Sequence, residues 1–178
     1  MALHSSIWKA NLSSGLILGL IIVVYTLIVY YLDLMFNVYQ GYILYLIQIL
    51  SLFILIKTYR ENYKNGFITY GQAVSSGIVI SLYAAIIYAA FIYILYAFID
   101  SGLVNKQLAA IEENFVKAGL PQNFIDSGLE MQKKFLQPKI FAPVKLISNF
   151  LGGTIISLIV AIFIRREGNA LLDNSERI

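Results

Sequence analysis

The 178-residue sequence has no cysteine and one histidine, His4. Without cysteine the chain forms no disulfide, and a single histidine without companion ligands makes no metal site. Charged residues are also scarce, at 13% of the chain, against roughly 25% in soluble domains. Hydrophobic residues make up 59%. So few charges cannot cover so much apolar surface in water, which excludes an ordinary soluble domain.

The hydrophobic residues are concentrated in four uncharged runs. These runs are Leu12–Leu32, Val38–Ile56, Gln72–Ile99 and Leu146–Ile164. A hydrocarbon core about 30 Å thick requires about 20 helical residues, and lipid leaves helices as the way to pair the backbone of such a run. The runs therefore predict an all-α membrane protein, a single membrane domain over residues 1–178. Its transmembrane helices are expected at about residues 11–32, 38–56, 72–99 and 143–164.

Residues 100–142 form the one sizeable polar segment between these runs. Within residues 105–136, Leu108, Ile111 and Phe115 recur at helical spacing, and a second apolar series follows Pro121. The pattern predicts an extramembrane amphipathic helical hairpin between the third and fourth transmembrane helices.

Orientation is predicted from the basic residues near the helix ends. The loop after the second run carries Lys57, Arg60 and Lys64, whereas the short turn after the first run carries no lysine or arginine. Because the first hairpin usually dominates insertion, we predict both termini in the cytoplasm and the segment 100–142 outside.

Two segments carry a family resemblance. The stretch Lys64–Ala73, KNGFITYGQA, leads into the third run, and Gly119–Phe135 contains GLP and MQKKF, with Pro138 beyond it. In these motifs, and in span order over nearly the whole chain, the sequence resembles a family of four-helix inner-membrane proteins of Bacteroidota. The family is numbered four-one-nine-nine among the domains of unknown function. The resemblance implies a multi-pass protein of a bacterial inner (plasma) membrane and carries over no activity or functional residues.

Small residues recur four positions apart in three of the runs. This spacing lets helix backbones approach closely and gain contacts that lipid does not supply. We interpret these faces as packing the four helices of one chain together; the alternative is a homodimer interface. The candidate packing residues are Gly15, Gly19, Gly77, Ser81, Gly153, Ser157 and Ala161.

Polar residues inside the runs are few. Gln48, Ser75 and Ser76 are expected to face the bundle, because polar groups in hydrocarbon are costly unless bonded. We interpret them as interhelical hydrogen-bonding groups, with a solute path as the alternative.

Ionisable residues are confined to the ends of the runs. Asp33, Asp100 and Lys145 fall at the same predicted boundary, where we expect them to reach water or headgroups. No run has an ionisable residue at its centre, which disfavours proton- or ion-coupled transport.

The sequence contains no recognisable catalytic constellation, cofactor site or metal site, and nothing in it indicates nucleic-acid binding. We therefore expect a non-enzymatic protein, embedded in lipid, that binds a protein partner through residues 105–136 or helps assemble a complex. The alternative is a small transporter or channel for an uncharged or lipid-like solute, acting as an oligomer. A membrane enzyme has the least support.

Overall fold

The computed structural model of the chain describes residues 6–37 and 39–167. Within these ranges it is all-helical, with six α-helices and one π-helical segment, η1. The elements are α1 Ile7–Tyr31, α2 Tyr39–Tyr63, α3 Tyr70–Ile94, η1 Leu95–Ile99, α4 Leu103–Lys117, α5 Gln122–Phe135 and α6 Pro138–Ile164. The head with His4, position 38 at the start of the second predicted span, and the tail after residue 167 lie outside the described residues.

Four of the helices have the length and composition of membrane spans. α1 and α2 have 25 residues each, α6 has 27, and α3 with η1 has 30. At about 1.5 Å per residue, each exceeds a hydrocarbon core of about 30 Å. Their outward faces are apolar, as Leu20, Ile54 and Phe163 illustrate at 58%, 61% and 74% exposure. These features identify a multi-pass membrane protein.

The helices extend beyond the predicted spans because charge does not stop a helix. α2 runs on to Tyr63 and ends where Asn65 and Gly66 adopt positive φ angles of 51° and 81°, a left-handed backbone that ends helices. α3 begins at Tyr70, where Thr69 and Gln72 form a reciprocal capping box.

The fourth span also begins earlier than predicted. α6 starts at Pro138 and continues through Pro143, whereas the sequence predicted a start at about residue 143. Proline is favourable in the first helical turn, where its missing N–H has no helical partner to lose. Pro143 lies just beyond that turn and leaves the helix continuous.

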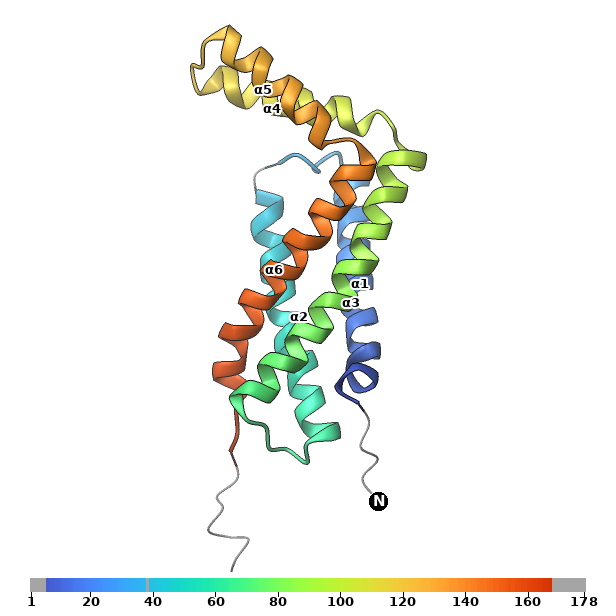
Figure 1. Ribbon diagram of the computed structural model, residues 1–178, viewed down its shortest axis with the longest axis vertical. Coiled ribbons are helices and arrows are strands. Elements are labelled where there is room, and N and C mark those ends of the chain that lie inside the picture. The colour runs from blue at the N-terminus through green and yellow to red at the C-terminus, as the bar shows by residue number, and fades with distance from the viewer. Residues whose placement is uncertain (1–5, 38, 168–178) are drawn as a thin grey trace, which may run out of the picture.

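Helix α3 occupies the centre of the bundle and packs most extensively against α1 and α6. Its buried surface includes small side chains such as Ala73, Ser76, Ala84 and Ala85, which allow close approach of the neighbouring helices. α4 and α5 lie side by side at one end, and the residues nearest the two termini lie at the other (Figure 1). We refer to these as the α4–α5 end and the terminal end.

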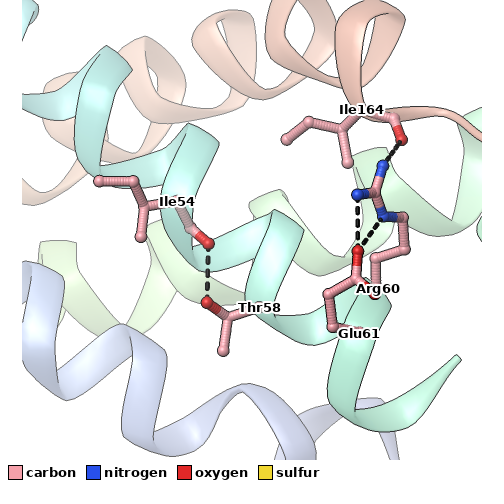
Figure 2. Close-up of polar contacts among 5 residues, drawn as sticks. All are labelled: Ile54, Thr58, Arg60, Glu61 and Ile164. Carbon is pink, nitrogen blue, oxygen red and sulfur yellow. Dashed lines mark hydrogen bonds and ion pairs between the residues drawn. The ribbon is translucent and has the colours of Figure 1, made fainter. Parts of the chain in front are cut away.

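At the terminal end, contacts between distant segments join α2, α6 and the loop after α2. Arg60 Nη1 donates to the carbonyl oxygen of Ile164 at 2.9 Å, and its guanidinium pairs with Glu61 (Figure 2). Ile68 and Arg166 exchange two backbone hydrogen bonds of 2.9 Å. These contacts anchor the last turn of α6.

Candidate functional site

A polar cleft opens in the half of the bundle nearest the α4–α5 end. It consists of two adjoining hollows of about 200 Å³ and 100 Å³, which share Leu44, Tyr88 and Lys145. The larger hollow is also lined by Tyr25, Thr26, Val29, Met35, Phe36, Gln40, Gly41, Ile92, Tyr96, Gln107 and Phe141. The smaller is also lined by Tyr45, Gln48, Ser148, Asn149 and Gly152. Hydroxyl and amide groups from five helices therefore meet around one lysine.

Lys145 lies two turns into α6. Its ammonium lies 5.1 Å from the centroid of the Phe141 ring, one turn earlier on the same helix. No described residue forms an ion pair with it. Lys145 was expected to reach water or headgroups at the membrane boundary, and the structure places it, half-buried, in the wall of the cleft between α2, α3 and α6.

Two hydrogen-bonded pairs line the larger hollow. The hydroxyl of Tyr25 bonds to the side chain of Gln40, joining α1 to α2. The hydroxyl of Tyr96 donates to Oε1 of Gln107 at 2.9 Å, joining η1 to α4. π-helical segments are frequent at functional sites, and here η1 directs Tyr96 at α4. The pair Tyr96–Gln107 thus connects the cleft to the α4–α5 end.

The smaller hollow contains polar side chains available to a ligand. Gln48 of α2 is only 3% exposed, and its amide forms no hydrogen bond with a described residue. Ser148 and Asn149 of α6 line the same hollow. Gln48 was one of the predicted intramembrane polar residues, and the structure places it in the cleft wall.

The other two predicted polar residues separate. Ser76 is fully buried and its hydroxyl donates to Oδ1 of Asn11 at 2.7 Å, joining α3 to α1. Ser75, which was expected to face the bundle, lies on the exposed face of α3. Successive helical residues point about 100° apart, and in α3 this turn takes Ser75 out of the buried face that holds Ser76.

The candidate packing glycines lie at close contacts between helices of this chain. A Cβ at Gly15 would meet Tyr83, and one at Gly19 would meet Ile87; both contacts join α1 to α3. A Cβ at Gly77 would meet Ser157 of α6. The faces are thus occupied by helices of the same chain.

The same small-residue face continues along α6. A Cβ at Gly153 would lie 2.5 Å from Oγ of Ser81. Ser157 donates to the Gly153 carbonyl at 2.7 Å, and Ala161 is fully buried. Ser81 Oγ is buried without a hydrogen-bond partner among the described residues.

Asp100 organises the junction between η1 and α4. Its carboxylate accepts hydrogen bonds from the Tyr30 hydroxyl and the Lys106 ammonium, each at 3.3 Å, and from the Gly102 amide at 2.9 Å. Burial favours the neutral acid, but the hydrogen bonds outweigh it and lower the pKa of Asp100. The hydrogen bond to Asp100 raises the pKa of Lys106. The carboxylate is thereby held ionised at the start of α4.

Sequence reasoning missed three residues that the structure makes prominent. Asn11 was assigned no role, Arg60 was interpreted only as a basic loop residue, and Lys145 only as a boundary charge. A polar side chain within or next to an apolar run was the available signal. The partners of Asn11 and Arg60 lie on other helices, as do most residues of the larger hollow that Lys145 lines. Within residues 6–37 and 39–167, no group of three His, Cys, Asp or Glu side chains is placed to hold a metal.

Comparison with known proteins places the chain in a family. Residues 13–166 match the family described as Protein of unknown function (DUF4199). This range takes in α2 to α6 whole and most of α1. No curated protein and no solved structure matches the chain. The chain therefore belongs to the DUF4199 family, and the resemblance predicted from its motifs is confirmed.

Proposed function

We propose that the protein is a non-enzymatic membrane component that binds a protein partner through α4 and α5. The observation that supports this is a row of large apolar side chains exposed on these helices, which project from one end of the bundle (Figure 1). Helices of 15 and 14 residues are too short to span a bilayer. We therefore propose that α4 and α5 form an extramembrane helical hairpin, in which Phe115 packs against Gly128.

The exposed row lies along one side of α5. Phe124, Met131 and Phe135 are 66%, 55% and 52% exposed. Their spacings of seven and four residues bring them to the same side of the helix. Leu120, at the turn before α5, is 42% exposed. In contact with water, such a contiguous apolar surface is typical of an interaction site. We call these four residues the α5 row.

The charge of the hairpin favours a protein partner over a lipid surface. Residues 103–136 contain four lysines and four acids, which gives no net charge. Two of the lysines are paired within their own helix, Lys117 with Glu113 at 2.6 Å and Lys134 with Glu130 at 3.3 Å. Binding to anionic headgroups needs an excess of unpaired basic residues. An apolar surface on a protein partner can cover the α5 row without any excess of basic residues.

We further propose that the protein lies in a bacterial inner membrane with both termini in the cytoplasm. Lys57, Arg60 and Lys64 gather at the terminal end, as do Arg165 and Arg166. Basic residues close to span ends favour the cytoplasmic side. The hairpin then faces the opposite compartment, and the partner is a protein of that compartment or of the same membrane.

A photo-crosslinking amino acid introduced at Met131 tests the partner proposal in intact cells. We expect one discrete protein adduct from position 131, identified by mass spectrometry. Lys133 provides the matched control, because it lies about 180° around α5 from Phe124 and should give no adduct. Adducts to lipid alone at position 131, or the same adduct at both positions, would contradict a protein partner at the α5 row.

A second candidate is an oligomeric transporter or channel for an uncharged or lipid-like solute. The polar cleft supports it, since hydroxyl and amide groups suit such a cargo. Four spans in one copy leave little room for a path, so this function requires a homo-oligomer. Reconstituted protein that stays monomeric and moves no solute would exclude it.

A further inference from the structure

The cleft holds a positive charge that no described residue neutralises. Its lining contains one lysine, Lys145, and neither aspartate nor glutamate among the residues described. The ammonium is accompanied by the face of Phe141 at 5.1 Å. A cation held among apolar helices is costly unless it is paired. A ring face offsets part of that cost, and an anion would offset more.

Hydrogen-bond donors lie in the cleft together with the Lys145 ammonium. Gln48 is only 3% exposed as a residue, and its amide forms no hydrogen bond with a described residue. It lines the smaller hollow together with Asn149, Ser148 and Lys145. Amide and hydroxyl groups donate to phosphate or carboxylate oxygens, and hydrogen bonds to ionised acceptors are stronger than neutral ones. The site therefore combines one cation with several donors.

The smaller hollow opens towards the lipid-facing surface. Tyr45 on α2 is 55% exposed, and Ser148 on α6 is also exposed. On α6, the residues four before, three after and seven after Ser148 are Val144, Leu151 and Ile155, all exposed. These positions share one helix face, so the polar opening is bordered by an apolar surface. A ligand with a charged head and a hydrocarbon chain matches both parts.

We propose that this cleft binds the anionic group, phosphate or carboxylate, of a membrane amphiphile. Lys145 neutralises the anionic oxygens, and Gln48 and Asn149 donate hydrogen bonds to them. The hydrocarbon chain lies outside, against the apolar surface of α6. This site lies within the bundle and does not depend on the binding of a partner by α4 and α5.

Native mass spectrometry of the full chain in a neutral detergent provides the test. The probes are phosphatidylglycerol, phosphatidylcholine and inorganic phosphate, added separately. We compare the wild type with Lys145→Gln, which removes the charge, and with Lys145→Arg, which keeps it. Lys139→Gln is the matched control, because Lys139 is an exposed lysine of the same helix outside the cleft.

We expect phosphatidylglycerol to bind at least about tenfold more tightly than phosphatidylcholine, and Lys145→Gln to remove that preference. Lys145→Arg and Lys139→Gln should retain it. Lys145-dependent binding of inorganic phosphate alone would support the anion site but overturn the amphiphile as its source. Binding that is equal in the wild type and in Lys145→Gln would overturn the site itself.

The substitution at Lys145 also needs a folding control. If Lys145→Gln elutes from a gel-filtration column and unfolds on heating as the wild type does in the same detergent, its loss of lipid binding is assigned to the site. If that variant unfolds, Gln48→Leu replaces it, since it removes a donor and keeps the charge. We expect Gln48→Leu to weaken phosphatidylglycerol binding by about threefold to tenfold, the range for one hydrogen bond; an unchanged affinity would overturn the proposed role of Gln48 and Lys145 in one site.

Discussion

Arg60 of α2 and Ile164 of α6 are 104 positions apart in the chain, yet Arg60 Nη1 donates to the Ile164 carbonyl at 2.9 Å (Figure 2). Ile164 is the last residue of α6, so its carbonyl has no partner within the helix. The guanidinium also lies at the negative end of the helix dipole. The side chain of Arg60 is 14% exposed, and the contact joins the ends of two spans.

Arg60→Leu should therefore destabilise the bundle at its terminal end. We expect a loss of about 1.5–3 kcal/mol, the range for a hydrogen bond to a charged group. Thermal unfolding in detergent measures it. Lys57→Leu removes an exposed positive charge one turn earlier on α2 and should leave stability within about 0.5 kcal/mol. Equal losses in the two variants would contradict a specific role for Arg60.

Neighbouring glycines of α6 should respond in opposite directions to alanine. A Cβ at Gly153 would lie 2.5 Å from Ser81 Oγ, whereas at Gly152 its nearest neighbour is Tyr45 Cε1 at 3.6 Å. Gly153→Ala should cost about 1–3 kcal/mol through overpacking. Gly152→Ala should gain up to about 1 kcal/mol, because alanine is the better helix former. Unfolding in increasing SDS separates the two, and a neutral Gly153→Ala would show that α3 and α6 are not in close contact.

Adjacent serines of α3 form a second matched pair. Ser76→Ala removes the 2.7 Å hydrogen bond to Asn11 and should cost about 0.6–1.7 kcal/mol, the range for bonds between transmembrane helices. Ser75→Ala, on the exposed face, should be neutral. A double-mutant cycle of Ser76→Ala with Asn11→Ala measures the pair directly. A coupling energy of zero would mean that the two side chains do not interact.

Stability should fall in acid through Asp100. Because the folded-state pKa of Asp100 is below its ordinary value, its contribution is fully present above the unfolded-state pKa of about 3.9. It is lost as the pH falls through the folded-state pKa. The melting temperature should therefore drop below about pH 4 and drop less in Asp100→Asn. Glu112→Gln, on an exposed residue of α4, is the control for charge; an identical acid profile in Asp100→Asn and the wild type would refute the prediction.

Much of the helical architecture could be predicted because it depends on local signals. Four uncharged runs of bilayer length required helices, and the structure has a helix at each of them. The end predicted for the second span, at residue 56, was too early for the helix, because charged residues do not end a helix and α2 continues to Tyr63. These are properties of neighbouring residues.

The cleft could not be predicted, because its residues meet only after the helices pack. Gln48, Tyr88 and Lys145 come from three helices, and nothing in their spacing indicates that they line one hollow. Ser75 and Ser76 look alike in sequence, but the rotation of α3 about its axis decides which one is buried. That rotation is determined by the contacts of the small residues with α1 and α6.

Labelling of single cysteines tests the central claim that four helices cross the bilayer with α4 and α5 opposite the terminal end. The natural chain has no cysteine, so each substituted residue is the one reactive thiol. In intact cells, a membrane-impermeant maleimide should label Asn114→Cys on α4 but not Asn62→Cys at the end of α2. Leu50→Cys, 57% exposed near the middle of α2, should remain unlabelled even after the cells are opened. Labelling of positions 62 and 114 from the same side, or ready labelling of position 50, would contradict the account.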